Sequence, residues 1–315
     1  MTTSVTPTLP STAEQNRPAA GGAGRARRRR STGWLYMAPA FVLVLVVTAY
    51  PLYFAARYSA FRMRMWEPVE FVGLGNYTHL LTEPRFLTNL LASAVYVFGG
   101  VLACAGIGLG LALALRGGGR WQRVLRTFIL IPWITSEVVV AITWRWLLNP
   151  QYGPLTSVFE RLGLPDFPNL FASETSALAA LTLVNVWRSL AFPMLMFLAA
   201  LQAVPKQTEE AAEVDGAGYW KRVRYVLVPA IMPVIVVTVI VLTINYFNMV
   251  VLVLDLTGGG PTGATEILGL RLYREAFEYF SVDTAATLTM VMLLINFVLA
   301  IFYFRALRRQ AGGEA

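Results

Sequence analysis

This sequence of 315 residues is 56% apolar and only 14% charged, whereas a soluble domain carries about 25% charged residues. Its apolar residues form several runs of about 18 residues or more, which excludes an ordinary soluble globular domain and indicates a polytopic membrane protein. The net charge of +8 suggests nucleic acid as a partner, but no basic face with interleaved aromatic residues occurs. We therefore expect a lipid bilayer and no nucleic acid around this chain.

The N-terminal segment combines low complexity with a run of arginines. Residues 1–24 are rich in Thr, Pro, Gly and Ala, which is typical of disorder, and Arg25 and Arg27–Arg30 follow. The apolar run from Leu35 continues for about 20 residues, which exceeds the roughly 7–15 residues of a signal-peptide core. We expect residues 1–33 to be a disordered basic tail that precedes an uncleaved transmembrane helix.

Six apolar stretches are long enough to be transmembrane helices, which need about 20 residues to cross the apolar core of a bilayer. They comprise residues 34–58, 88–115, 124–148, 177–203, 225–252 and 284–304. The sequence thus predicts an all-α polytopic membrane protein with a transmembrane domain over residues 34–308 and a C-terminal tail over residues 309–315.

Cysteine and histidine are too rare for two common kinds of site. The single cysteine, Cys104, lies in an apolar run and allows no disulfide within the chain. The single histidine, His79, does not favour a histidine-based metal site. We therefore expect no metal and no cofactor on this chain itself.

Lysine and arginine are distributed unequally between the two ends of the six stretches. The N-terminal segment, the loops after the second and fourth stretches, and the C-terminal tail are basic and lie on one side if the chain crosses six times. The alternate loops mix arginine with acids such as Glu67, Glu83 and Asp166. Because basic loops stay in the cytoplasm, we expect a bacterial cytoplasmic (inner) membrane with both termini and the loop 204–224 on the cytoplasmic side.

The loop over residues 204–224 has the pattern of a short helix pair. Pro205 ends the fourth stretch, and Thr208 is a candidate N-cap before acids that complement a helix dipole. Gly216 and Gly218 break that helix and permit a sharp turn into a second short segment. We expect a helix–turn–helix at the membrane surface, where small side chains let another protein approach closely.

The spacing of residues in this loop carries a family resemblance. Glu210-Ala-Ala, then Gly216, Val226, Val228 and Pro229 resemble the EAA loop of bacterial ABC importer permeases, although Val228 stands where that pattern usually has Leu. In that family the loop docks into the ATPase subunit. The resemblance implies that the following residues couple the chain to a separate ATPase: Glu210, Ala211, Ala212, Asp215, Gly216 and Pro229.

Further segments resemble the carbohydrate-uptake branch of that family. They are Phe71–Tyr77 (FVGLGNY), Asn149–Gly153 (NPQYG), Asn185–Trp187 (NVW) and Leu256–Pro261 (LTGGGP). The resemblance implies the type I importer permease fold, a second permease chain in a heterodimer, a dimeric ABC ATPase and an extracytoplasmic sugar-binding protein. ATP and Mg are expected on the ATPase, because the glycine runs of this chain lack the lysine of a P-loop.

Polar side chains in the fifth stretch mark a candidate substrate pathway. A sugar needs hydrogen-bonding groups and flat aromatic faces, and polar groups are costly in a bilayer unless they face a cavity or a partner helix. The resemblance places the cavity just before the Gly-Gly-Pro segment. We expect its lining to include Asn245, Tyr246 and Asn248, with Trp187, Phe192 and Met194 from the fourth stretch. The alternative is that these residues bond or pack between helices.

Glu137 and Arg188 are charged residues inside the third and fourth stretches. Charges at such positions are candidates for function. One interpretation is a proton relay, and the other is an ion pair with a structural or gating role, for example between Glu137 and an arginine of this chain or of the second permease. A relay usually needs several carboxylates or histidines, and Glu137 is the only central one, so the sequence favours the pair.

Three functions are compatible with a chain of this kind. The sequence favours a transport subunit and not an enzyme, namely an ABC importer permease that moves a carbohydrate while a partner hydrolyses ATP. The alternative is an ion-coupled secondary solute transporter, which works without an ATPase and depends on Glu137. An intramembrane enzyme is disfavoured, because no Ser/His, HExxH or paired-Asp arrangement lies in the apolar stretches.

Overall fold

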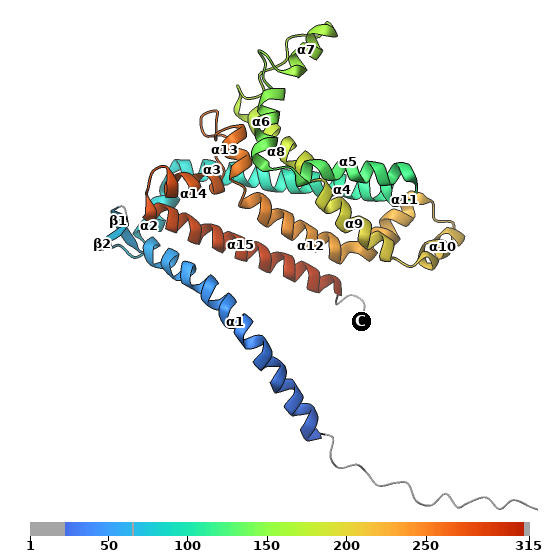
Figure 1. The fold of residues 1–315 in the computed structure, drawn as a ribbon, viewed down its shortest axis with the longest axis horizontal. Helices are drawn as coiled ribbons and strands as arrows, with labels where there is room; N and C mark the ends of the chain where they lie inside the picture. Colours follow the sequence, from blue (N-terminus) through green and yellow to red (C-terminus); the bar gives the residue numbers. More distant parts are fainter. Residues whose placement is uncertain (1–22, 65, 312–315) are drawn as a thin grey trace, which may run out of the picture. The chain divides into compact units, whose positions relative to one another are not determined.

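The computed structural model describes residues 23–64 and 66–311. The chain divides into two compact units, residues 1–54 and 55–315, and each is described by itself. In the first unit the described residues belong to helix α1 (Ala23–Ser59), which contains the apolar segment Met37–Ser59 (Figure 1). The predicted disordered tail is helical over residues 23–33, and its residues 1–22 lie outside the described part.

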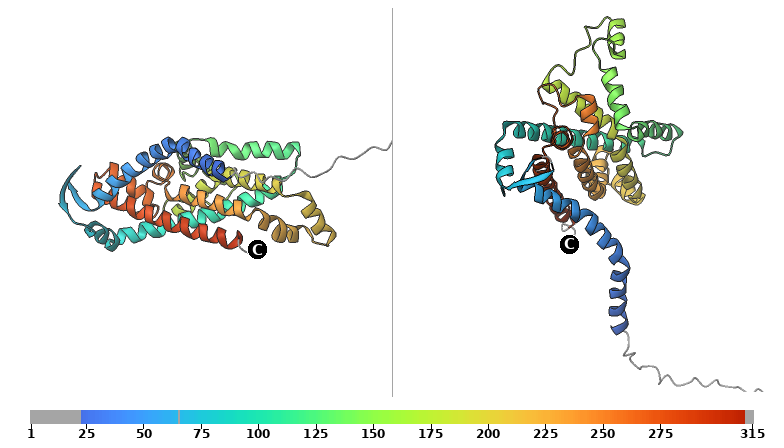
Figure 2. Two further views of the ribbon diagram at one scale, coloured as in Figure 1. Left: turned by 90° about the horizontal axis from the view of Figure 1, so that it is seen from below. Right: turned by 60° about the vertical axis from the view of Figure 1, so that its left-hand side comes forward.

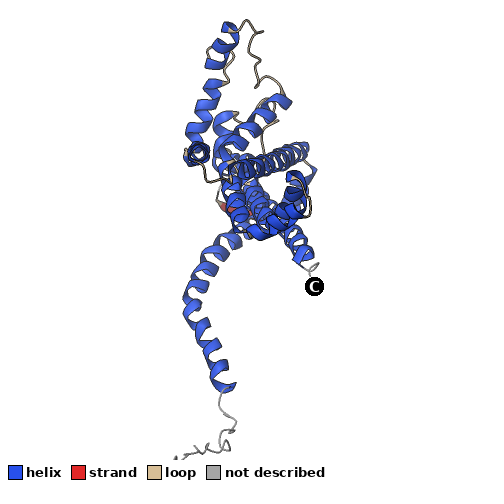
Figure 3. Cartoon of the chain, turned by 90° about the vertical axis from the view of Figure 1, so that its right-hand side faces the viewer, coloured by secondary structure: helices blue, strands red, loops and turns tan. Residues whose placement is uncertain are grey.

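Helix dominates the described residues of the second unit, with one small hairpin (Figure 3). Strands β1 (Phe61–Arg64) and β2 (Glu67–Phe71) pair in antiparallel register and precede α2 (Gly75–Thr82). Helix α3 (Pro84–Ala94) then passes through one π-helical turn, η1 (Val95–Gly99), into α4 (Gly100–Leu115). Together they form one apolar helical run over Pro84–Leu115, which contains the second predicted span, residues 88–115.

The third predicted span, residues 124–148, is not one helix. Helices α5 (Arg120–Ile134) and α6 (Glu137–Leu147) meet at an angle of 99°. Between them Thr135 and Ser136 adopt extended backbone with ψ of 140° and 139°. Serine favours the position before a helix and glutamate favours its first turn, so Ser136-Glu137 starts a new helix inside the apolar stretch.

The fourth predicted span, residues 177–203, is also bent. After helix α7 (Pro154–Arg161) and a loop, α8 (Glu174–Ser189) and α9 (Ala191–Ala203) meet at 44°. Pro193 has no N–H group to bond the carbonyl of Ser189, which weakens the helix at this turn.

The helix–turn–helix predicted for residues 204–224 is confirmed. Helix α10 (Lys206–Val214) ends where Gly216 takes a φ of +79°, and α11 (Tyr219–Arg222) follows. The N–H of Gly216 donates to the carbonyl of Glu213 at 3.0 Å. Thr208 is not the N-cap, because Pro205 holds that position and α10 already begins at Lys206.

The last helices lie close to their predicted positions, with shifted ends. From α11 the chain continues through the π turn η2 (Val223–Leu227) into α12 (Val228–Phe247) and then α13 (Val251–Leu256). The fifth span therefore ends at Phe247 and not at residue 252. After α14 (Leu268–Phe277), helix α15 (Val282–Ala311) reaches past the predicted end of the domain at residue 308. Residues 312–315 of the predicted tail lie outside the described part.

The core of the second unit lies between long helices. Helix α4 packs on α9, and α12 packs on α4, α9 and α15, so these helices run side by side (Figures 1 and 2). Within the described residues, four helices are long and apolar enough to cross a membrane, or up to six if each bent pair is one span. The type I importer permease architecture predicted from sequence agrees with this arrangement.

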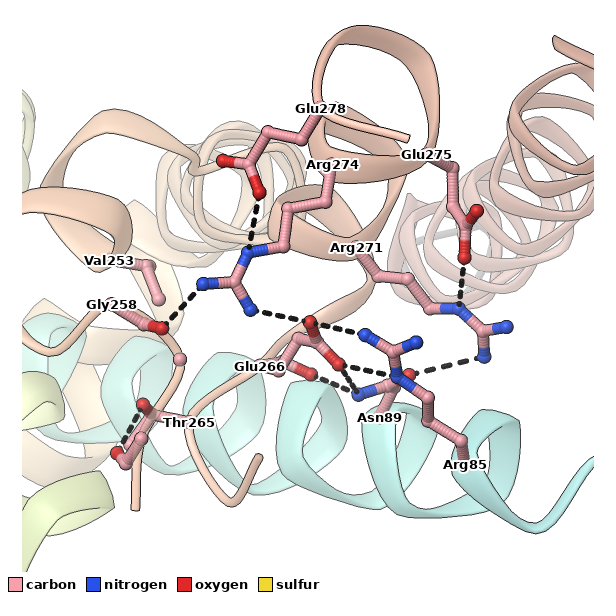
Figure 4. A network of polar contacts seen from close by, with 12 residues as sticks. Arg85, Asn89, Val253, Gly258, Thr265, Glu266, Arg271, Arg274, Glu275 and Glu278 are labelled. Atoms are coloured by element: carbon pink, nitrogen blue, oxygen red, sulfur yellow. Dashed lines mark hydrogen bonds and ion pairs between the residues drawn. The ribbon is translucent and has the colours of Figure 1, made fainter. Parts of the chain in front are cut away.

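A buried polar network joins the loop after α13 to α3 and α14 (Figure 4). Glu266 is only 2% exposed. Its carboxylate accepts hydrogen bonds from Arg85 at 2.9 and 3.0 Å, from Arg274 at 2.8 Å and from Asn89 at 3.1 Å. Burial alone would raise the pKa of Glu266, but the bonds from Arg85 and Arg274 hold it below its usual value. This network fixes the Gly-Gly-Pro segment against the helices.

We expect Glu266→Gln to destabilise the chain at neutral pH by about 1–3 kcal/mol, because it removes the buried anion shared by Arg85 and Arg274, whose side chains are 41% and 20% exposed and so keep part of their hydration. The pKa of Glu266 is lower in the folded chain than in the unfolded one, so its contribution is complete above the unfolded value and is lost as the pH falls through the folded one. Thermal unfolding in detergent between pH 7 and pH 3 measures this. The difference between wild type and variant should shrink toward the acid end.

The exposed pair of Arg62 and Glu70, 2.8 Å apart on the hairpin, provides the control. Glu70→Gln should change stability by less than about 1 kcal/mol, because solvent screens such pairs. An equal loss in the two variants would contradict the role given to Glu266.

Candidate functional sites

A cavity of about 550 Å³ lies where the two bent spans meet α12. The cavity brings together six of the residues predicted from the sequence: Glu137, Arg188, Phe192, Asn245, Tyr246 and Asn248. Trp133, Ser189 and Met249 also line it and escape the sequence prediction. The sequence held a signal for two of the three: Trp133 follows Pro132 in the third apolar stretch, and Ser189 lies one helical turn after Asn185.

The cavity wall offers aromatic faces and amide oxygens. The ring centroids of Trp133 and Phe192 lie 6.4 Å apart at an interplanar angle of 31°. The side-chain N–H groups of Asn245 and Asn248 donate to carbonyls one turn earlier in their helix, at 2.9 and 2.8 Å. Both asparagines are exposed, so their amide oxygens can accept hydrogen bonds from ligand hydroxyl groups.

Tyr246 joins the cavity to the core behind it. Its ring packs on Tyr96 with centroids 5.5 Å apart, and the hydroxyl of Tyr96 accepts a hydrogen bond of 2.7 Å from Asn185. Gly100 makes room for this packing, because a Cβ at position 100 would overlap Cε1 of Tyr246 and lie 3.4 Å from Cγ2 of Thr182. A small residue at position 100 therefore sets the position of a cavity-lining ring.

Gly100→Ala should destabilise the chain by about 1–3 kcal/mol, since an added methyl group in a packed core forces side chains to shift. Gly106→Ala on the same helix is the matched control, because nothing lies within 4 Å of a Cβ at that position. Thermal unfolding of the two variants in detergent measures the difference. A loss in Gly106→Ala as large as in Gly100→Ala would contradict the prediction.

Glu137 and Arg188 form an ion pair in the cavity wall. Oε1 of Glu137 lies 3.1 Å from a terminal guanidinium nitrogen of Arg188, and the side chains are 33% and 13% exposed. Glu137 is the first residue of α6, directly after the 99° bend, and Arg188 lies two residues before Leu190 at the 44° bend. The pair therefore links the two breaks, in agreement with the ion-pair interpretation.

Two residues predicted for the pathway lie elsewhere. Trp187 faces a separate cavity of about 150 Å³ and packs edge-on against Trp144, with ring centroids 5.3 Å apart. Met194 is fully buried and packs near Gly108 of α4. Both lie on turns of α8 and α9 that face neighbouring helices, which corresponds to the packing alternative.

The residues of the EAA-like pattern form an open surface. Within α10 no residue is buried, and Glu210, Ala211, Asp215, Gly216 and Pro229 are exposed while Ala212 is partly so. Val214 and Trp220 are 88% and 76% exposed beside them. Exposed apolar side chains that lie together on one surface can contact another protein. Neither residue was singled out from the sequence, although Val214 stands between two acids, Glu213 and Asp215.

The model of one protein family, described as "Binding-protein-dependent transport system inner membrane component", matches residues 106–311. This range contains the cavity lining and the surface helix pair, which consists of α10 and α11. The chain belongs to this family. It is a membrane-embedded permease subunit of a binding-protein-dependent ABC importer. This membership overturns the alternative of an ion-coupled secondary transporter.

Individual relatives agree with this membership. The permease is 30% identical to the trehalose/maltose transport system permease protein MalF of Thermococcus litoralis over 288 residues, which cover 90% of this chain and 96% of that one. It is 30% identical to the sulfoquinovosyl glycerol transport system permease protein SmoG of Agrobacterium fabrum, covering 87% and 89% of the two chains. In fold it is similar to a chain in a crystal structure of a bacterial ABC transporter that imports alginate, with a TM-score of 0.75 at 19% identity, covering 90% of this chain and 99% of that one.

Proposed function

We propose that this permease imports a carbohydrate, such as a disaccharide or an oligosaccharide. The observation that carries the proposal is the cavity lining, which combines the aromatic pair Trp133 and Phe192 with the amide oxygens of Asn245 and Asn248. Aromatic faces suit the C–H surfaces of a sugar ring, and acceptor oxygens suit its hydroxyl groups. The carbohydrates in the names of its relatives support the same substrate class.

Energy for transport comes, in this proposal, from a separate dimeric ATPase that docks on α10. The exposed surface of α10 supports its role as the docking site. ATP and Mg bind to the ATPase. A loaded extracytoplasmic binding protein on one side and ATP on the other shift the population between inward-open and outward-open states. A second permease chain supplies the other half of the pathway. Both termini and α10 lie on the cytoplasmic side, as the lysine and arginine distribution indicates.

Affinity purification of this chain from its native membrane in a gentle detergent tests the assembly. We expect mass spectrometry to identify an ATPase with a P-loop, a second permease and a sugar-binding protein. The recovered proteins are then reconstituted in liposomes and assayed with trehalose, maltose and an amino acid. ATP-dependent uptake of a sugar and not of the amino acid supports the proposal, and the reverse preference would overturn the substrate class.

A further inference from the structure

Helix α10 makes two ion pairs within the described residues, and they connect it to different parts of the chain. Glu213 pairs with Arg222 of α11, which lies on the other side of the same turn. Glu209 pairs instead with Arg116, which lies 93 positions earlier at the end of α4. One pair therefore stays inside the surface helix pair, and the other leaves it.

The contact between Arg116 and Glu209 has the geometry of a rigid link. Both terminal nitrogens of Arg116 donate to the two carboxylate oxygens of Glu209, one of them at 3.1 Å. The side chains are only 30% and 20% exposed. A two-bond pair between planar groups fixes orientation as well as distance, whereas none of the residues of α10 is fully buried.

The corner that carries Arg116, residues 116–119 between α4 and α5, is itself held tightly. Arg126 of α5 donates to the carbonyls of Leu115 and Gly117, the latter at 2.9 Å. The side chain of Gln122 accepts from the N–H of Gly119 at 3.0 Å and donates to the carbonyl of Ala114 at 3.3 Å. Since these bonds join the end of α4 to the first turns of α5, a force on Arg116 acts on both helices.

Helix α5 leads from this corner to the candidate substrate cavity. It begins at Arg120 and carries Trp133 near its other end, about 20 Å away at 1.5 Å per residue. Trp133 lines the cavity, and Glu137 follows directly after the bend. A helix transmits displacement along its axis, so the corner and the cavity wall are mechanically connected.

We propose that Arg116 is a positioning residue for energy coupling. Its pair with Glu209 ties α10 to the α4–α5 corner, so that a displacement of α10 by the ATPase moves α5 and the cavity wall at Trp133. This route is additional to the direct chain connections of α10 into α9 and α12. The inference rests on the coupling role proposed above for α10.

The test uses the complete assembly of both permeases, ATPase and binding protein in liposomes loaded with ATP. The measured quantity is the number of sugar molecules imported per ATP hydrolysed. Arg116→Gln should lower this ratio by about fivefold or more, the range in which coupling between sites is usually found. The exchanged pair Arg116→Glu with Glu209→Arg should restore most of it, because the link is re-formed with opposite polarity.

Arg62→Gln is the control, because it removes an ion pair, with Glu70 on the hairpin, that involves neither α10 nor the corner. It should change the ratio by less than about twofold. Thermal unfolding and recovery of the ATPase with the chain should be the same for Arg116→Gln and wild type, which separates positioning from folding or docking.

The outcomes separate the inference from the proposed function. If the wild-type assembly imports no sugar with ATP, the proposed function fails. If the wild type is coupled and Arg116→Gln keeps the same ratio, or if Arg62→Gln is equally impaired, only the role of Arg116 is overturned. Failure of the exchanged pair to restore the ratio also overturns it.

Discussion

Gly216→Pro is expected to uncouple ATP hydrolysis from transport while leaving the chain folded and inserted. Proline fixes φ near −65° and has no N–H, whereas Gly216 has a φ of +79° and its N–H donates to Glu213. The turn between α10 and α11 must therefore change shape. We expect the imported sugar per ATP to fall by about tenfold or more in the reconstituted assembly.

Gly163→Pro provides a close match on the opposite side of the predicted topology. Gly163 has a φ of +64°, its N–H donates to Glu160 at 3.1 Å, and nothing lies within 4 Å of a Cβ there. Proline should therefore distort the local backbone about as much at position 163 as at position 216, but Gly163→Pro should leave the sugar-to-ATP ratio unchanged.

The charge reversal Glu210→Lys, on the exposed face of α10, should uncouple ATP hydrolysis from transport as Gly216→Pro does. Normal coupling in both Gly216→Pro and Glu210→Lys would contradict the coupling role proposed for α10.

The surface helix pair was predictable because its signals are local. Pro205, the acids, and the glycines at 216 and 218 each act on their own turn of backbone, and the structure follows them closely. The one error, Thr208 as N-cap, arose because proline also starts a helix well. Local chemistry determines where this helix begins and ends, so no distant contact was needed.

The bends in the third and fourth spans were harder to predict, because hydropathy does not distinguish a straight helix from a broken one. Residues 124–148 are apolar on average, with only Arg126, Glu137 and Arg145 charged, and the helix-start signal at Ser136-Glu137 is only two residues long. Pro193 gave a clearer signal for the second bend. These breaks bring Glu137 and Arg188 together at the cavity wall. The cavity therefore depends on helix breaks that hydropathy averaged over about 20 residues does not reveal.

Contacts between distant segments could not be predicted from the sequence. Glu266 meets Arg85 across 181 positions, and Arg271 meets Glu83 across 188. The sequence shows each charge but not its partner, and the same holds for Glu209 with Arg116. The packing of Trp187 and Met194 against other helices could not be predicted either, because the spacing of residues along a helix does not determine which face of the helix lines the cavity.

Arg188→Gln is expected to impair transport more than the double substitution Glu137→Gln with Arg188→Gln. Each single substitution leaves one charge without its partner in a mostly desolvated site. Breaking a fully buried pair costs about 3–5 kcal/mol. Because the side chain of Glu137 is one-third exposed, we expect a smaller cost of about 1–3 kcal/mol here. The double variant removes both charges and keeps side chains of similar size. We expect it to recover sugar uptake to within about threefold of wild type, a loss of less than 1 kcal/mol.

The same variants test the ion pair against the proton-relay interpretation of Glu137. If the pair positions the two bent spans, uptake driven by ATP persists when a protonophore collapses the proton gradient, and the double variant behaves as described. If Glu137 carries protons, Glu137→Gln alone abolishes uptake and neutralising Arg188 cannot restore it. Uptake assays of the four members of this cycle, with and without protonophore, therefore decide which role the charged pair has. Because the pair joins both helix breaks at the cavity wall, we expect the positioning outcome: uptake persists with protonophore, and the double variant recovers it.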